Sequence, residues 1–146
     1  MKVGLICTRG GHLAEMERLL PAISEYNHFW VIQSEPIPDR RKDAYKIGNL
    51  SHAPFSYLPK FPEILKILRQ ESPDVLVSTG SDVAIPFFLL ARLLGIHTIF
   101  IESVCRTKTL SVTGKIVYYL SDEFYVQWPE LADDLGTKAQ YAGSVL

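Results

Sequence analysis

The sequence has 146 residues, of which 47% are hydrophobic and 21% charged, a composition typical of a soluble globular protein. This length fits one domain, and the net charge of −1 gives no overall field that would attract nucleic acid. No apolar run approaches the ~20 residues that a membrane-spanning helix needs, which excludes such a helix but not attachment to a membrane surface. Two cysteines without metal-type spacing or a signal peptide, Cys7 and Cys105, indicate reduced thiols in a cytoplasmic protein.

Strands and helices are expected to alternate along the whole chain. Short apolar runs predict strands at residues 2–7, 29–33, 74–78, 97–101 and 123–127, with a further short strand within 45–50. Apolar residues at helical spacing predict helices at residues 11–25, 62–72, 83–94, 113–120 and 129–135. Residues 34–44 form a polar loop in this prediction, and residues 140–146 form a last strand or a linker.

This alternation indicates one α/β domain over residues 1–146. Near-continuous apolar strands separated by helices are typical of a parallel sheet covered on both faces, which is a Rossmann-like, doubly wound fold. Ligands of such sheets bind at the carboxyl ends of the strands. That rule directs attention to residues 7–12, 78–82, 102–109 and 127–130.

A double glycine, Gly10-Gly11, follows the first strand and opens the first helix. Backbone N–H groups in such a turn can approach an anion, and the helix N-terminus adds a partial positive charge. Arg9 and His12 could add donors to a phosphate oxygen. The alternative is a tight turn that needs glycine for its backbone geometry alone.

A second turn of the same kind follows the strand at 74–78. Ser81 or Asp82 is expected to cap the next helix, and Gly80 could admit a ligand close to the backbone. Glu35 stands near the position of a ribose-binding acid, but there is no G-x-G-x-x-G motif, and an ordinary loop charge is the better interpretation.

Glu102 directly follows a buried strand and is expected at the ligand-binding edge of the sheet. Its carboxylate could orient a sugar hydroxyl, act as a base, or pair with Arg106. Arg106, Lys108 and Lys115 suit a diphosphate or an anionic lipid surface, although scattered basic residues more often form a solvated face.

The helix at 113–120 and the aromatic residue after the last main strand could contact a membrane or a partner. The apolar side of this helix comprises Val112, Ile116, Val117, Tyr119 and Leu120, with Tyr118 beside it. Such a side is usually core, but with Lys108 and Lys115 beside it this side could also lie at a membrane interface. Trp128 could pack internally, stack on a sugar or fill a partner's pocket.

No Ser-His-Asp constellation and no metal-ligand pattern is present, so no metal is expected. The residues alone therefore predict an α/β ligand-binding domain, most simply one for a phosphorylated ligand.

Several segments resemble a known family. Those that carry the resemblance are Gly10-Gly11-His12 and residues 78–86, 102–106, 110–115 and 126–128, of which 113–128 is the most specific. They resemble bacterial capsular and exopolysaccharide biosynthesis proteins, which are similar to the membrane-anchor subunit of the eukaryotic UDP-GlcNAc transferase of dolichol-linked oligosaccharide synthesis. The chain also resembles the N-terminal half of the peptidoglycan GlcNAc transferase that acts on lipid I.

The resemblance implies half of a two-chain glycosyltransferase of the GT-B fold. This chain would supply the acceptor-side domain and the membrane contact, and a second subunit would bind the UDP-sugar donor, so no cofactor is expected here. A polyprenyl-diphosphate-linked saccharide would lie near Gly10, Gly11 and His12, and a partner could dock near residues 139–146. His12 and Glu102 are the candidate catalytic residues. Gly80, Ser81, Arg9, Arg106 and Lys108 are the further candidates for binding the acceptor and its phosphates, and Lys115, Tyr118 and Trp128 those for partner or membrane contact.

The chain departs from the family pattern at Cys7 and Arg9, where small residues are commoner, and this affects the expected ligand geometry. Met1-Lys2 leads straight into the first strand, so we expect a cytoplasmic protein with a peripheral contact on the inner face of the cell membrane. Two other functions stay open at this point. The chain could be a non-catalytic scaffold that activates a partner glycosyltransferase, or an independent nucleotide-binding module.

Overall fold

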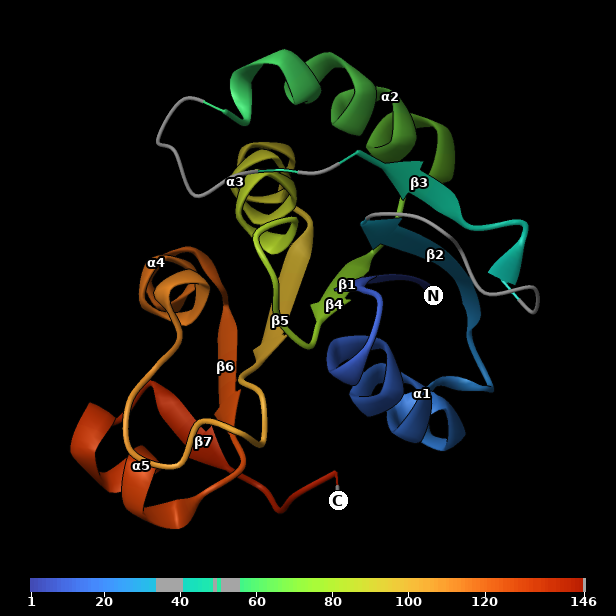
Figure 1. The fold of residues 1–146 in the computed structure, drawn as a ribbon. Coiled ribbons are helices and arrows are strands. Elements are labelled where there is room, and N and C mark those ends of the chain that lie inside the picture. Colours follow the sequence, from blue (N-terminus) through green and yellow to red (C-terminus); the bar gives the residue numbers. More distant parts are fainter. Residues whose placement is uncertain (34–40, 49, 51–55, 146) are drawn as a thin grey trace.

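The computed structural model describes residues 1–33, 41–48, 50 and 56–145. Within these residues, seven parallel strands form one sheet in the order β3-β2-β1-β4-β5-β6-β7 (Figure 1). The strands are β1 Lys2–Thr8, β2 Asn27–Gln33, β3 Tyr45–Ile47, β4 Val75–Ser78, β5 His97–Ile101, β6 Glu123–Val126 and β7 Ala139–Tyr141. The helices are α1 Gly11–Ile23, the short 3-10 helix η2 Leu58–Lys60, α2 Phe61–Glu71, α3 Ala84–Leu94, α4 Val112–Leu120 and α5 Pro129–Leu135.

The predicted Rossmann-like, doubly wound α/β fold is confirmed. The predicted helices and the strands β1, β2, β4, β5 and β6 lie within one or two residues of their expected bounds, and β3 falls within residues 45–50 as predicted. Apolar runs were a sufficient signal because the central strands are buried on both faces, as in β1, whose residues 3–7 are all buried. Residues 140–146 were expected to form a last strand or a linker; the strand is the short β7, which ends at Tyr141. Glu35 and most of the predicted loop at 34–44 lie outside the described residues.

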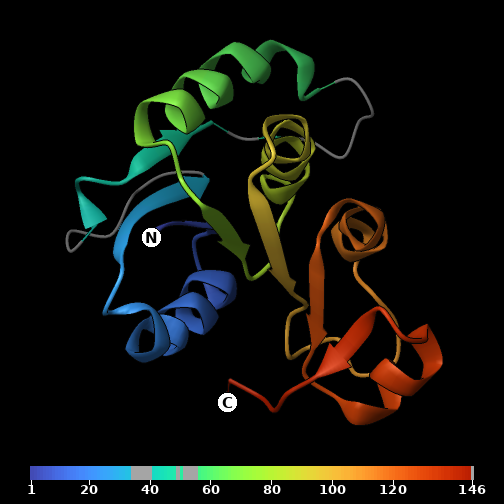
Figure 2. The ribbon, with the colours of Figure 1, turned by 180° about the vertical axis from the view of Figure 1, so that it is seen from behind.

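The helices are divided unequally between the two faces of the sheet. Among the described elements, α1 is the one helix on the first face, over β1 and β2, whereas α2, α3, α4 and α5 cover the other (Figures 1 and 2). The core follows this division, because one cluster contains Leu13 and Met16 of α1 and the other contains Phe87, Phe88 and their neighbours from the four-helix side.

The topology fixes where a ligand site can form. After β1, the chain adds β2 and then β3 toward one end of the strand order. It then returns through α2 to β4, which pairs with β1 on its other edge. The order therefore reverses between β1 and β4, and their carboxyl ends diverge into α1 and α3. A crevice at such a switch point is the expected ligand site of an open α/β sheet.

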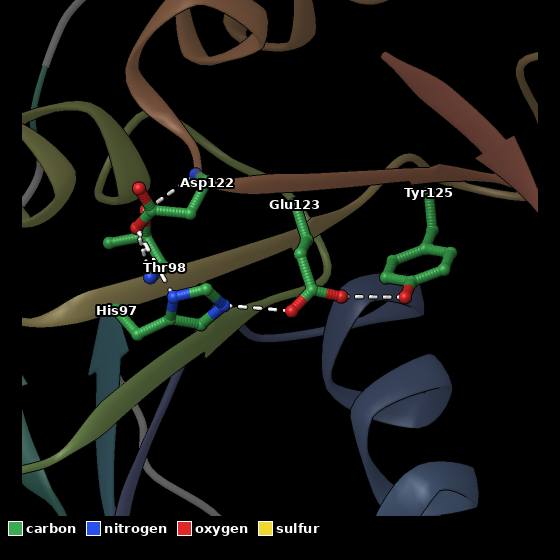
Figure 3. A network of polar contacts seen from close by, with 5 residues as sticks. All are labelled: His97, Thr98, Asp122, Glu123 and Tyr125. Carbon is green, nitrogen blue, oxygen red and sulfur yellow. Dashed lines mark hydrogen bonds and ion pairs between the residues drawn. The ribbon is translucent and has the colours of Figure 1, made fainter. Parts of the chain in front are cut away.

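Two polar clusters tie the strands together at the opposite, amino-terminal edge. Glu71, the last residue of α2, accepts the Tyr45 hydroxyl and pairs with Lys2 Nζ at 2.5 Å. Near β5 and β6, His97 Nε2 lies 2.7 Å from Glu123 Oε1, and the other Glu123 oxygen accepts the Tyr125 hydroxyl at 2.6 Å (Figure 3). In the same cluster, Asp122 Oδ2 accepts both the backbone N–H and the hydroxyl of Thr98. These carboxylates are paired within the fold, so both clusters stabilise the sheet.

The tie at Glu71 predicts a loss of stability in acid. Hydrogen bonds from Lys2 and Tyr45 lower the pKa of Glu71 below its usual 4.5. A lowered folded-state pKa contributes stability that is present above the unfolded value and is lost as pH falls through the folded value. Glu71→Gln is therefore expected to lower the free energy of unfolding at pH 7 by about 1 kcal/mol. The gap to the wild type should shrink as the pH falls below about 4.5.

Denaturant unfolding at a series of pH values measures this gap, with Glu25→Gln in the exposed turn after α1 as the matched control. A gap that stays constant from neutral pH to pH 3 would contradict the assignment.

Candidate functional site

A cleft of about 540 Å³ opens at the carboxyl edge of the sheet, at the switch point. Residues from the ends of β1, β4 and β5 and from the helices that follow them make its walls. They are Thr8, Gly11, His12, Glu15, Ser81, Asp82, Glu102, Ser103, Cys105, Arg106, Ser111, Val112 and Thr113. Five of the predicted site residues are among them: Gly11, His12, Ser81, Glu102 and Arg106.

His12 is held across the switch point by two reciprocal hydrogen bonds to Thr79. The ring Nδ1 lies 2.8 Å from the Thr79 carbonyl oxygen, and the Thr79 hydroxyl donates to the His12 carbonyl oxygen at 2.7 Å. A carbonyl oxygen only accepts, so Nδ1 carries the proton in this bond. In the neutral imidazole this leaves Nε2, with its lone pair, as the ring atom that can take up a proton at the cleft.

The two glycines of the turn after β1 have different roles, one in backbone geometry and one in leaving space beside the backbone. Gly10 has a φ of 89°, in the region that favours glycine, so the turn needs it for backbone geometry. Gly11 has no such need, and a Cβ built there would meet no atom within 4 Å. The N-cap residue of α1 is Gly10, which has no side chain, and no side-chain cap bond is present there in the described part of the chain. The first N–H groups of α1 therefore lie uncapped at the cleft wall, where an anion is favoured. Arg9 is exposed outside the lining.

The turn after β4 corrects one expectation, because neither Ser81 nor Asp82 caps α3. The N-cap residue is Val83, with no side-chain capping bond. The Ser81 hydroxyl instead donates to Gln33 at 2.9 Å, and Asp82 accepts the Thr113 hydroxyl at 2.9 Å. Tertiary partners at the end of β2 and the start of α4 therefore replace the local cap. Gly80 packs against the imidazole, since a Cβ there would lie 2.7 Å from His12 Cε1.

Glu102 is 1% exposed and is satisfied by its own loop. One oxygen accepts the Ser103 N–H at 3.0 Å, and the other accepts both the N–H and the hydroxyl of Ser111 at 3.0 Å. Ser111 is the N-cap of α4 and accepts the Gly114 N–H at 2.8 Å. The carboxylate thus closes the loop between β5 and α4. Its partners in the described structure do not include Arg106, so pairing with Arg106, one of the three roles considered for Glu102, is not observed.

Sequence reasoning gave no role to two residues of this region: Glu15, which it missed, and Gln127, which lies in the segment 127–130 expected at the ligand-binding edge. Glu15 is 8% exposed and accepts the Ser103 hydroxyl at 2.8 Å and Gln127 Nε2 at 2.9 Å. Helical periodicity was an available signal, because Glu15 stands three residues after His12 and so on the same side of α1. For Gln127, the place after a strand was a signal, but no local pattern indicates its partner Glu15, 112 residues away.

The remaining predicted contact residues lie at different places. Lys108 and Lys115 are exposed but outside the cleft lining. Tyr118 packs against the core and donates its hydroxyl to Leu135 O at 2.9 Å. Trp128 is also partly buried, and its Nε1 donates to Val104 O at 2.7 Å, which anchors the loop after β5. Both aromatic side chains therefore have internal partners.

The cysteines have separate environments, and both are free thiols. Burial, with a smaller contribution from Glu17, raises the pKa of Cys7 to about 12. Cys105 is exposed on the cleft loop. Within the described ranges, no group of three His, Cys, Asp or Glu side chains could hold a metal ion. No helix in the same part of the chain has the length and apolarity to cross a membrane.

Fold and cleft define the class of protein: a Rossmann-like α/β domain with a ligand cleft at the switch point of its sheet. Solved structures share this fold. MurG from Acinetobacter baumannii superposes with a TM-score of 0.73 at 16% identity, over 99% of this chain and 45% of that one. UDP-N-acetylglucosamine 2-epimerase from Rickettsia bellii gives a TM-score of 0.75 at 15% identity, again over 99% and 45%. The chain thus spans less than half of the length of these proteins.

The sequence identifies the family. Residues 47–145 match the family described as "Oligosaccharide biosynthesis protein Alg14 like", and the chain belongs to this family. The human protein named UDP-N-acetylglucosamine transferase subunit ALG14 is 24% identical over 181 aligned positions, covering 100% of this chain and 83% of the human one. The Saccharomyces cerevisiae protein of the same name is 46% identical over 56 residues, covering 38% of this chain and 24% of the yeast one.

Because α4 approaches Glu102 closely, replacing a helical glycine with alanine is expected to destabilise this protein, the opposite of the usual effect. Alanine normally stabilises a helix relative to glycine by about 1 kcal/mol. A Cβ at Gly114, however, would lie 2.0 Å from Glu102 Oε2. Gly114→Ala is therefore expected to destabilise the protein by about 1–3 kcal/mol, measured by denaturant unfolding. Lys115→Ala, at the next and exposed position, should change stability by less than about 0.5 kcal/mol. A Gly114→Ala protein as stable as the wild type would show that Glu102 does not hold this position.

Proposed function

We propose that this chain is the acceptor-binding and membrane-recruiting subunit of a two-chain, UDP-sugar-dependent glycosyltransferase. It would add a sugar to a polyprenyl-diphosphate-linked saccharide, in the assembly of a surface polysaccharide. The main support is membership of the Alg14-like family, whose relatives in human and yeast are named as UDP-N-acetylglucosamine transferase subunits. The fold likeness to MurG, which covers 45% of that protein, is compatible with one half of a two-part enzyme.

The cleft offers a place for the acceptor diphosphate. The uncapped N-terminus of α1 supplies backbone N–H donors and a partial positive charge, and Arg106 supplies a side-chain cation on the facing loop. Gly11 has no packing role, so its missing side chain leaves room for a phosphate to approach the backbone. Glu15, Asp82 and Glu102 also line the cleft. Neutral donors of the protein satisfy these carboxylates without removing their negative charge, so the N-terminus of α1 and Arg106 have to offset it when a diphosphate binds.

In this proposal His12 is the general base. Transfer requires the acceptor hydroxyl to lose a proton as it attacks the sugar carbon, while the bond to the departing UDP breaks on the partner subunit. The Thr79 carbonyl holds His12 Nδ1 as a donor, which presents Nε2 as the proton acceptor. The buried contacts of Glu102 favour a different role, so we assign Glu102 to positioning the loop that carries Arg106.

A transfer assay tests the subunit proposal. Labelled UDP-sugars and lipid-linked acceptors are incubated with this chain, with a donor-domain chain from the same genome, and with both. Activity only with both chains supports the proposal. Activity of the donor-domain chain alone would make this chain a scaffold, and activity of this chain alone would refute the division into two subunits.

His12→Asn tests the base in the reconstituted enzyme. Asparagine can keep a donor to the Thr79 carbonyl but has no atom that takes up a proton at neutral pH. We expect kcat to fall by about 10²–10⁴-fold, with stability and partner binding retained. The control is His28→Asn, the same substitution at an exposed histidine at the other edge of the sheet, which should leave kcat unchanged. Equal kcat values for the two variants would remove His12 from the chemistry.

We place the membrane contact on α4, on a surface that we call the α4 stripe: Val112, Ile116 and Tyr119. These side chains are 59%, 43% and 77% exposed, and their spacing puts them on one side of the helix. The stripe begins at the cleft, because Val112 also lines the cleft. The exposed Lys115 lies beside the stripe, next to Ile116 in the chain. It replaces Tyr118 and Trp128 in this role, since both have internal partners. An acceptor lipid bound in the cleft would leave it along the membrane surface, on the cytoplasmic side.

Replacing all three residues of the α4 stripe with serine is expected to weaken binding to anionic phospholipid vesicles at least about tenfold, because apolar surface no longer enters the interface. Vesicle co-sedimentation measures this, after circular dichroism confirms the fold. Leu93→Ser/Leu94→Ser removes exposed apolar side chains from the end of α3 and serves as the control. A similar loss in both variants would mean that the α4 stripe has no special role.

A further inference from the structure

Glu15 is a buried carboxylate in the cleft wall that the proposed reaction does not use. It lies on α1 one turn after His12, and its two oxygens accept from different parts of the chain. Oε1 accepts the Ser103 hydroxyl at 2.8 Å, and Oε2 accepts Gln127 Nε2 at 2.9 Å and the Val104 N–H at 3.4 Å. α1 is thereby joined to the loop after β5 that carries Arg106 into the cleft.

Gln127 uses its whole hydrogen-bonding capacity in this region. Its Nε2 donates to Glu15 and, at 3.0 Å, to the Glu102 carbonyl oxygen. Its Oε1 accepts the Val145 N–H at 2.9 Å and the Ser144 hydroxyl at 3.2 Å. The amide orientation is forced, because a flipped amide would turn its oxygen toward two acceptors and its NH2 toward the Val145 N–H.

The partners of Gln127 Oε1 belong to the C-terminal segment, residues 142–145. This segment leaves β7 and runs toward α1, beside which it ends in Figures 1 and 2. There Arg18 of α1 donates to the Val145 carbonyl oxygen at 2.8 Å. The segment also forms one wall of an apolar groove with Leu19, Ile101 and Tyr125.

We propose that Glu15 and Gln127 form a relay that transmits the position of the C-terminal segment to the Arg106 loop, residues 103–106, at the cleft. When the segment is docked, its N–H and hydroxyl hold the Gln127 oxygen, the Gln127 amine holds Glu15, and Glu15 holds Ser103 and Val104. When the segment moves, the relay loses its outer donors and the Arg106 loop loosens. Glu15 is a positioning residue here, because it acts through the loop.

The coupling goes beyond the proposed function, since it makes the cleft sensitive to whatever contacts the C-terminal segment. A partner that pulls the segment away would release the loop, and one that presses it onto α1 would order the loop. Because these polar groups are buried, a small displacement of the C-terminal segment has a large effect on the loop: an unpaired buried donor or acceptor costs more free energy than the hydrogen bond itself contributes.

Hydrogen exchange tests the relay without any activity measurement. Val145→Pro removes the N–H that donates to Gln127, whereas the matched Val145→Ala keeps it. We expect the amides of residues 103–106 to exchange about three- to tenfold faster in Val145→Pro than in Val145→Ala, with the amides of β2 unchanged. The same rates at 103–106 in both proteins, or an equal increase in β2, would overturn the relay.

A second pair of variants examines Glu15 itself. Glu15→Gln can keep all three contacts: its amide oxygen can accept from Gln127 and Val104, and its NH2 can donate to the Ser103 hydroxyl oxygen. Glu15→Ala loses them. Exchange at 103–106 should rise about tenfold or more in Glu15→Ala and stay within about twofold of wild type in Glu15→Gln. Equal rates in the two variants would refute the positioning role.

The kinetic effect rests on the proposed function. In the reconstituted enzyme, Val145→Pro and Glu15→Ala should raise KM for the lipid-linked acceptor about three- to tenfold, with kcat nearly unchanged. A loss of kcat in Glu15→Gln would instead make Glu15 a catalytic base and overturn its positioning role. If the wild-type pair transfers no sugar, the proposed function fails, while the exchange experiment still decides on the relay.

Discussion

The geometry of the cleft depends on burying one carboxylate, Glu102, at the end of β5. A charge removed from water must be matched by donors, and the chain supplies three from Ser103 and Ser111. Meeting that demand bends the loop after β5 back onto the start of α4 and leaves no room for a side chain at Gly114. The position of Arg106 follows from this, because it lies between the residues that Glu102 holds.

α1 combines two functions of the fold. Its N-terminal end contributes the uncapped N–H groups and His12 to the cleft, while its apolar side is the only helical cover of one sheet face in the described structure. Packing of Leu13 and Met16 therefore fixes the orientation of His12 and of Glu15 one turn later. Because α1 covers mainly β1 and β2, Ile99 and Ile101 on β5 stay only partly buried. The relay through Gln127 crosses this thinly covered side.

Most of the fold could be predicted from the sequence, because buried parallel strands give continuous apolar runs and the carboxyl edge of such a sheet holds the ligand site. The errors arose where local and tertiary partners compete. Ser81 and Asp82 have the composition of helix caps, but Gln33 and Thr113, distant in sequence, take their side chains. On α4, periodicity grouped Val117 with Tyr119 on one apolar side, whereas in the structure Val117 is buried and Tyr119 is exposed. Glu15 and Gln127 could not be paired from spacing at all.

The two thiols make the natural chain suitable for site-specific labelling. Thiolates, not thiols, react with maleimides, and a buried Cys7 with a pKa of about 12 stays protonated at any pH at which the protein would be handled. Cys105 is exposed on the loop next to Arg106. A fluorophore added to unmodified protein should thus attach at one position, at the mouth of the cleft. Acceptor arrival and partner assembly could then be followed by fluorescence without engineering a cysteine.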